Sequence, residues 1–156
     1  MSEHKANIIW KRSSPDFLKG KYSREHTWAF DGGFTMPASP SPSVVPTPYS
    51  NPAHVDPEEA FVASISSCHM LTILHLASRQ GFQIDIYEDE AVRTMTKNEK
   101  GVPWMSRVML NPRIVYSGGK PPTPAEEERL HHLAHEQCYI ANSVRTEIVV
   151  QATGGA

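Results

Sequence analysis

Cys68 and Cys138 are the most reactive side chains of this sequence, and they are its only cysteines. A buried cysteine is commonly an inert apolar residue. Two features favour chemistry here. Both cysteines fall in segments with helical patterning, and each has an imidazole nearby, because His69 follows Cys68 and His135 precedes Cys138 by three residues. The pattern predicts a redox pair, since a thiol reacts as its thiolate and needs a polar or positive neighbourhood.

The position of Cys68 indicates what else the site requires. The residue falls in the middle of a predicted helix, so the positive helix N-terminus cannot stabilise its thiolate directly. A cation must come from elsewhere in the fold. Arginine is the usual choice because it stays charged when buried.

A metal site is an alternative use of the second cysteine. His131, His135 and Cys138 stand at i, i+4 and i+7, which is one helical face, and Cys68 could be a fourth ligand. The other interpretation is a polar face with ordinary histidines. The sequence lacks a Cys-x-x-Cys or His-Glu-x-x-His signature, and we therefore predict no metal.

The helix that carries Cys68 is the clearest element and is predicted over 56–80. Asp56 can cap it, Pro57 suits its first position, and Gly81 can stop it. Its middle is apolar on nearly every side, with residues Phe61, Val62, Ala63, Ile65, Met70, Leu71, Ile73, Leu74, Leu76 and Ala77. Such a helix is expected to be buried at the centre of the fold.

The remaining elements predict an α+β fold in which residues 1–156 form a single domain. Strands are expected over 5–12, 22–31, 34–37, 83–97, 102–117 and 146–151. A second helix is expected from the Thr123 cap towards Cys138, and Asp31-Gly32-Gly33 is typical of a hairpin turn. The six prolines within 37–52 predict an extended loop, which is either a surface connector or a functional segment.

Composition restricts the class of protein. A hydrophobic fraction of 39% and a charged fraction of 21% indicate a soluble globular chain. The net charge of -2, without a long basic run, argues against nucleic-acid partners. We expect no membrane span, because polar residues interrupt the most apolar segment, and no secretory signal. Two cysteines in such a chain suggest the reducing cytoplasm.

Two motifs resemble those of the OsmC/Ohr family of thiol-dependent hydroperoxide peroxidases. Asp56-Pro57-Glu58-Glu59-Ala60-Phe61, followed by Cys68 in an apolar helix, resembles the family's core motif. Cys138-Tyr139-Ile140-Ala141-Asn142-Ser143 resembles the segment of its later cysteine, although many relatives have proline where this chain has Tyr139. The order of elements agrees along nearly the whole chain. The resemblance implies an OsmC-like fold, with antiparallel sheets around a long buried helix.

The resemblance also implies roles for individual residues. Cys68 matches the cysteine that attacks peroxide, Cys138 the resolving cysteine, and Glu58 the active-site glutamate. The family uses an N-terminal arginine, for which we select Arg24, with Arg12 as the alternative.

The implied reaction converts an organic hydroperoxide to an alcohol through a Cys68 sulfenic acid and a Cys68–Cys138 disulfide. A dithiol, either a small molecule or a lipoyl-type protein, then reduces the disulfide. No cofactor is implied. The alternatives are a non-catalytic protein of the same fold that binds a small ligand, or a metal-binding protein.

Helix geometry predicts an intertwined homodimer. Glu58 and Cys68 are ten residues apart, which is about 15 Å along one helix, and they point to different faces. They cannot meet on one straight helix. Two central helices packed across a two-fold axis would bring Glu58 of one chain towards Cys68 of the other. The alternative is a monomer in which the Pro-rich loop covers the helix.

Overall fold

The computed structural model describes residues 2–151. The chain forms two compact units, Met1–Ala60 and Phe61–Ala156. Both contain strands, and helix α1 (Pro57–Arg79) begins in the first unit and continues through the second. The α+β class is confirmed. The single-domain assignment over 1–156 stays a prediction.

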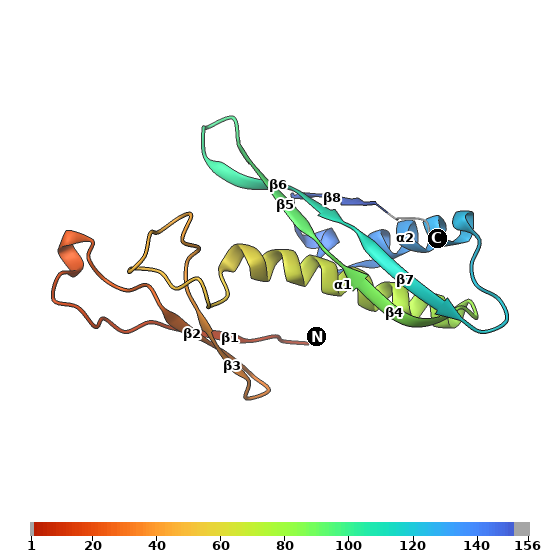
Figure 1. Ribbon diagram of the computed structural model, residues 1–156, viewed down its shortest axis with the longest axis horizontal. Helices are drawn as coiled ribbons and strands as arrows, with labels where there is room; N and C mark the ends of the chain where they lie inside the picture. The colour runs from red at the N-terminus through yellow and green to blue at the C-terminus, as the bar shows by residue number, and fades with distance from the viewer. Residues whose placement is uncertain (1, 152–156) are drawn as a thin grey trace. The chain divides into compact units, whose positions relative to one another are not determined.

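The first unit contains a three-stranded antiparallel sheet in the order β1-β2-β3 (Figure 1). Its elements are β1 (Ala6–Ile9), the short 3-10 helix η1 (Phe17–Lys19), β2 (His26–Phe30) and β3 (Thr35–Ala38). The predicted hairpin is confirmed, with Gly33 at a φ of 87° in the turn between β2 and β3. Strand β2 begins four residues later than expected, since residues 22–25 form no strand.

The Pro-rich segment is a loop, as predicted. It closes on itself inside the first unit, because the amide of Asn51 donates to the hydroxyl oxygen of Ser39 at 2.8 Å. The amide of Ser39 in turn donates to the carbonyl of Val55 at 3.0 Å. Ser39 and Ser50 are both buried. This loop is therefore an ordered part of the first unit that leads the chain into α1.

Helix α1 begins and ends where the sequence predicts. Asp56 and Glu59 form a reciprocal cap, in which Asp56 Oδ1 accepts from the Glu59 amide at 2.7 Å and Glu59 Oε2 accepts from the Asp56 amide at 3.1 Å. Gly81 takes the left-handed conformation just after the helix, with a φ of 82°. The helix has 23 residues, and Cys68 lies at its centre.

Each of the two long strands predicted after α1 is two strands. The first is divided into β4 (Gln83–Asp89) and β5 (Val92–Lys97), and the second into β6 (Pro103–Leu110) and β7 (Pro112–Ser117). The residues at the two breaks are hydrogen-bonded to each other. Asn111 Nδ2 donates to the carbonyl of Glu90 at 2.8 Å, and the Asn111 backbone amide donates to Asp89 Oδ1 at 2.7 Å. The paired breaks divide the strands between two sheets.

The sheets of the second unit are a β4-β7 pair and a three-stranded sheet in the order β5-β6-β8. Strand β8 (Glu147–Val150) pairs parallel to β6, whereas the other pairings are antiparallel. The antiparallel sheets that the resemblance implies are therefore confirmed, and β8 adds one parallel pairing to them. This parallel pairing is possible because α2 (Pro124–Gln137) and the short η2 (Ala141–Ser143) lie between β7 and β8 in the chain.

Helix α2 has the predicted capping box, with the Thr123 hydroxyl oxygen and the Glu126 amide 3.2 Å apart. In the second unit, α1 and α2 lie against the strands (Figure 1). One core cluster joins both helices to β4 and β7 and contains Ile73, Ala77, Phe82, Leu130 and Ala134. A second cluster joins α1 to β6 and contains Ile65, Val108 and Leu110.

The burial of α1 is less complete than its sequence predicts. Its fully buried residues form one stripe, namely Ile65, His69, Ile73 and Ala77. Apolar residues on other faces are accessible, and Leu71 is 59% exposed. By length and hydropathy alone, α1 could cross a membrane. The buried stripe shows instead that one face of α1 packs in the core of the second unit.

Candidate functional site

The two cysteines are 70 residues apart in the chain and adjacent in the fold. The thiol of Cys138 donates to Cys68 Sγ at 2.7 Å, and both cysteines are free. Cys68 comes from the middle of α1, and Cys138 caps the C-terminal end of α2. The packing of α2 on α1 therefore brings together the two most reactive groups of the chain.

Cys68 faces a pocket of about 630 Å³ in the second unit. One wall comes from α1 and the other from the segment after α2, and the lining residues are Ser64, Ser67, Cys68, Leu71, Thr72, His75, Gln137, Tyr139 and Ile140. Apolar side chains and hydroxyl groups both contribute to this lining. Such a pocket suits a small molecule with an apolar body and a polar reactive end.

The segment after α2 fixes the backbone at Cys138. Asn142 Nδ2 donates to the carbonyls of Glu136 and Cys138, both at 2.9 Å. The Ser143 hydroxyl donates to the carbonyl of Tyr139 at 2.7 Å, and the Ala141 amide donates to Cys138 Sγ at 3.4 Å. The Asn-Ser motif therefore satisfies carbonyls at the end of α2 and holds the Cys138 thiol in place.

The two thiols have different environments. Cys68 is half-buried and lines the pocket, whereas Cys138 is only 1% exposed. Burial, followed by the hydrogen bond to Cys68, raises the pKa of Cys138. Cys138 is therefore a protonated thiol at neutral pH. This asymmetry makes Cys68 the thiol that a molecule in the pocket can reach.

We expect iodoacetamide to modify Cys68 well before Cys138 at pH 7. The reagent attacks thiolates, and the raised pKa and burial of Cys138 both reduce its reaction. Peptide mass mapping over a time course measures the two rates, and the Cys68→Ser variant gives the rate of Cys138 alone. Equal rates in the folded protein would contradict the difference in accessibility.

The candidate arginine belongs to the first unit. The Arg24 guanidinium stacks on the Tyr22 ring, with 3.9 Å between its central carbon and the ring centroid, and donates to the Tyr22 carbonyl at 2.9 Å. Arg24 lines an aromatic pocket of about 480 Å³ with Trp10, Phe17 and other residues. Arg12 is exposed, and its guanidinium donates to the nearby Ser14 carbonyl at 3.0 Å. Of the two arginines, Arg24 is therefore the one with a defined pocket.

Glu58 lies in the first turn of α1. Its side chain is half-buried and makes no hydrogen bond or ion pair with any other residue between 2 and 151. The capping carboxylates are those of Asp56 and Glu59 instead. Among residues 2–151, the Glu58 carboxylate therefore has no bonding partner.

The two histidines expected beside the thiols lie elsewhere. His69 Nε2 forms a hydrogen bond of 3.0 Å with His131 Nδ1, and both imidazoles are buried. His135 faces a separate pocket on α2. Within residues 2–151, no hydrogen bond joins an imidazole to either thiol. These two imidazoles therefore make no hydrogen bond here that would favour either thiolate.

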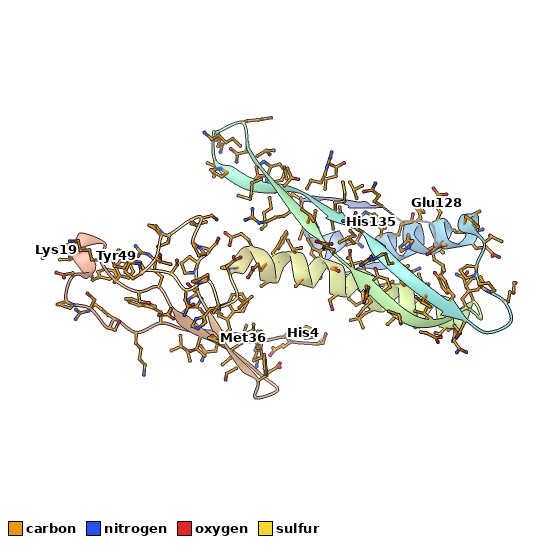
Figure 2. All side chains as sticks on the ribbon, in the orientation of Figure 1. His4, Lys19, Met36, Tyr49, Glu128 and His135 are labelled. Carbon is orange, nitrogen blue, oxygen red and sulfur yellow. The ribbon has the colours of Figure 1, made fainter. Side chains whose placement is uncertain are left out.

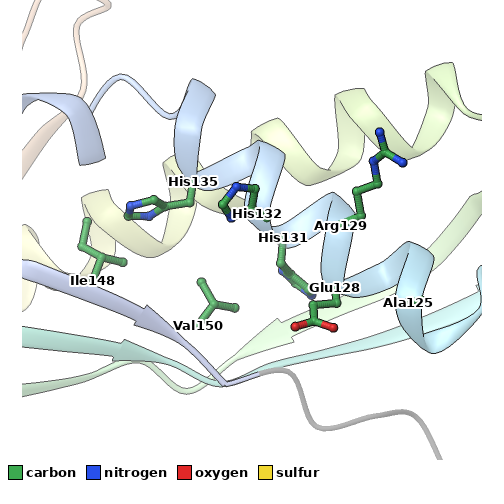
Figure 3. A pocket seen from close by; sticks show the side chains of 8 residues that line it. All are labelled: Ala125, Glu128, Arg129, His131, His132, His135, Ile148 and Val150. Atoms are coloured by element: carbon green, nitrogen blue, oxygen red, sulfur yellow. The ribbon is translucent and has the colours of Figure 1, made fainter.

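The α2 pocket has a volume of about 530 Å³, and it contains two of the proposed metal ligands. Figure 3 shows side chains of α2 on one side, including His131 and His135, and Ile148 and Val150 of β8 on the other. Figure 2 places His135 and Glu128 on the same helix. The described part of the chain contains no group of three or more residues arranged to hold a metal ion. The metal-binding alternative therefore has no preformed ligand set here.

Comparison with known proteins gives a consistent result. Residues 50–153 match a family model described as OsmC-like protein. An OsmC-like protein of unknown function from Vibrio cholerae is 52% identical, with a TM-score of 0.95 and coverage of 97% of this chain and 99% of that one. A comparison with curated proteins gave no match.

More distant solved structures share the fold. The organic hydroperoxide resistance protein OhrB of Bacillus subtilis is 19% identical, with a TM-score of 0.66 and coverage of 97% of this chain and 98% of that one. An organic hydroperoxide resistance protein from Elizabethkingia anophelis, with thiocyanate bound, is 19% identical, with a TM-score of 0.69 and coverage of 97% and 94%. At this identity, the similarity establishes the OsmC-like fold alone.

Proposed function

Since this chain belongs to the OsmC-like protein family, we propose that it is a thiol-dependent peroxidase that reduces organic hydroperoxides to alcohols. The observation that carries the proposal is the thiol pair itself. An accessible Cys68 lines a pocket, and a buried Cys138 lies 2.7 Å from it. Such a pair suits one cysteine that reacts with substrate and a second that resolves the product.

The reaction begins at Cys68. Its thiolate attacks the terminal oxygen of the hydroperoxide, the O–O bond breaks, and the leaving alkoxide takes a proton to become the alcohol. Cys68 is thereby oxidised to a sulfenic acid. The protonated Cys138 thiol then condenses with it, releases water and forms the Cys68–Cys138 disulfide. An external dithiol, either a small molecule or a lipoyl-type protein, reduces this disulfide by exchange and is itself oxidised.

The resemblance to the family also assigns roles to Arg24 and Glu58. The guanidinium of Arg24 would stabilise the thiolate and polarise the peroxide, and Glu58 would hold that guanidinium in place. The aromatic pocket around Arg24 and the unpaired Glu58 carboxylate support these roles. The proposed reaction uses no metal or organic cofactor. We place the protein in the cytoplasm, where the reducing conditions would keep both thiols reduced between turnovers.

The direct test is consumption of cumene hydroperoxide by the purified protein. With dithiothreitol present, we expect many turnovers and one alcohol for each peroxide consumed. Without a reductant, we expect one turnover for each chain. A non-catalytic ligand-binding protein would bind such a molecule in the Cys68 pocket without consuming it. Failure to consume peroxide by a fully reduced, folded protein would contradict the enzyme assignment.

We further propose that two chains form an intertwined homodimer with a shared site. Apolar residues of α1, such as Leu71, stay exposed to solvent, because no part of residues 2–151 of the same chain packs over them. Strands of the second unit also expose apolar residues, namely Ile86, Val92, Met95 and Val115. A second copy would bury these surfaces and could bring its Glu58 to Cys68.

Mixing two inactive variants tests the shared site. Cys68→Ser lacks the attacking thiol and Glu58→Ala lacks the orienting carboxylate. A mixed dimer would contain one intact site, so we expect about a quarter of the parent activity, since random exchange makes about half the dimers mixed. Mass spectrometry of intact complexes confirms the exchange. A mixture that exchanges and stays inactive would place Glu58 and Cys68 of one site on the same chain.

A further inference from the structure

The buried stripe of α1 contains one polar residue. Ile65, His69, Ile73 and Ala77 follow each other at four-residue spacing, and His69 is 2% exposed. Its partner on α2, His131, is 4% exposed. The two rings are nearly parallel, with 3° between their planes and 5.3 Å between their centroids. A hydrogen bond between α1 and α2 therefore lies in the middle of an apolar contact.

Apolar clusters lie along α1 on both sides of this pair. Ile73 and Ala77 belong to the cluster with Leu130 and Ala134 of α2, and Ile65 belongs to the cluster with β6. Apolar contacts are non-directional and tolerate small shifts of one helix on the other. A buried hydrogen bond does not tolerate such a shift of one helix on the other, because the shift would leave the two bonded nitrogens buried without a partner. The pair therefore selects one register of α2 on α1.

The selected register is the one that brings the thiols together. Cys68 and His69 are consecutive on α1, and His131 and Cys138 are seven residues, or two turns, apart on the inner face of α2. Besides the apolar packing, two hydrogen bonds thus join the helices, and they are about 10 Å apart along α2. One contact would allow α2 to pivot and move its C-terminal end. Two contacts fix the position of Cys138.

The imidazole pair needs no counterion to stay intact. Burial, together with the nearby His131 and His135, lowers the pKa of His69 to about 4. Burial also lowers the pKa of His131, against the opposing effect of Asp89. Both rings are neutral at pH 7, so one nitrogen donates and the other accepts. The hydrogen bond between them therefore forms under the conditions in which the thiols react, whereas His131 Nε2 is buried without a hydrogen-bond partner among residues 2–151.

We propose that His69 and His131 are positioning residues that hold Cys138 against Cys68 for disulfide formation. This role builds on the proposed peroxidase reaction, in which Cys138 must reach the oxidised Cys68. Neither histidine touches the substrate pocket at Cys68. Their effect is therefore expected on the second step of the reaction, closure of the disulfide, and not on the first attack.

The test measures the disulfide directly in a double variant, His69→Leu with His131→Leu. Leucine removes both partners, so neither nitrogen is left unsatisfied. The full-length protein is equilibrated in glutathione redox buffers, and the ratio of disulfide to dithiol is read by thiol trapping and mass spectrometry. We expect a ratio about 10- to 100-fold lower than in the parent, because small displacements of reacting groups have effects of this size. His132→Leu is the control, since His132 is adjacent but exposed.

Two further variants separate positioning from core filling. His131→Asn keeps a polar group near the place of Nδ1 and is expected to recover most of the parent ratio. If the double variant does not fold, His131→Leu alone carries the test, with the same direction of change. A folded leucine variant with the parent ratio would overturn the proposal. The redox equilibrium uses no peroxide, so its result is independent of whether the chain is a peroxidase.

After peroxide treatment, the folded leucine variants should also accumulate more Cys68 sulfinic acid. The Cys68 sulfenic acid would persist longer before it condenses with Cys138, so that a second peroxide molecule would oxidise more of it to sulfinic acid. The rate of the first attack should stay within about twofold of the parent, since Cys68 and its pocket are unchanged. An unchanged share of sulfinic acid would contradict the positioning role.

Discussion

Replacing Cys68 with serine is expected to lower the rate of hydroperoxide consumption on the order of 10³-fold or more. Serine keeps the size of the side chain and removes the nucleophilic sulfur. The pocket residues on α1 are unaffected, so the variant should fold and fail only in chemistry. A coupled assay with an excess of dithiothreitol measures the rate.

The Cys138→Ser variant is the matched comparison. Cys138 is buried and has a raised pKa, so its loss should leave the first attack at Cys68 close to the parent rate. The sulfenic acid would then lack its internal partner, and Cys68 should proceed to sulfinic acid under excess peroxide without a dithiol. Reversed results, with Cys138→Ser inactive in the first turnover, would assign attack to Cys138 instead.

Arg24→Ala is expected to slow peroxide attack by about 10²- to 10³-fold, the usual cost of losing a group that stabilises developing charge. The measurement is the second-order rate with organic hydroperoxide in a stopped-flow experiment. Arg12→Ala is the control and should remain within about twofold of the parent, because the hydrogen bond of Arg12 to Ser14 is local and exposed.

Arg24→Lys refines the same experiment. Lysine keeps the positive charge and loses the planar guanidinium that stacks on Tyr22 and donates to its carbonyl. We expect an intermediate rate. An Arg12→Ala variant that loses activity, beside an active Arg24→Ala variant, would transfer the role to Arg12.

Local signals in the sequence predict the helices of this fold well. The cap at Asp56 and the capping box at Thr123 lie within a few residues of the groups that they satisfy, so sequence spacing alone identifies them. The breaks at Glu90 and Asn111 are different, because each is stabilised by the other from 21 residues away. The continuous apolar patterns of 83–97 and 102–117 therefore predict two strands, whereas the structure has four.

The site shows the same division between local and distant information. Cys68 and Cys138 could be selected because they are the only cysteines and lie in motifs of a known family. The His69–His131 contact could not, since its members are 62 residues apart and only packing makes them partners. One signal was available, because His69 occupies the four-residue stripe of Ile65, Ile73 and Ala77. A polar residue on such a stripe requires a buried partner.

The most direct test of the central claim is the mass of the intact chain after one equivalent of cumene hydroperoxide without a reductant. We expect a monomer mass two hydrogens lower than that of the reduced protein, and a single cross-linked peptide pair that joins Cys68 to Cys138. Dithiothreitol should restore the original mass. A stable Cys68 sulfinic acid with Cys138 still free, or an unoxidised chain beside unconsumed peroxide, would contradict the central claim.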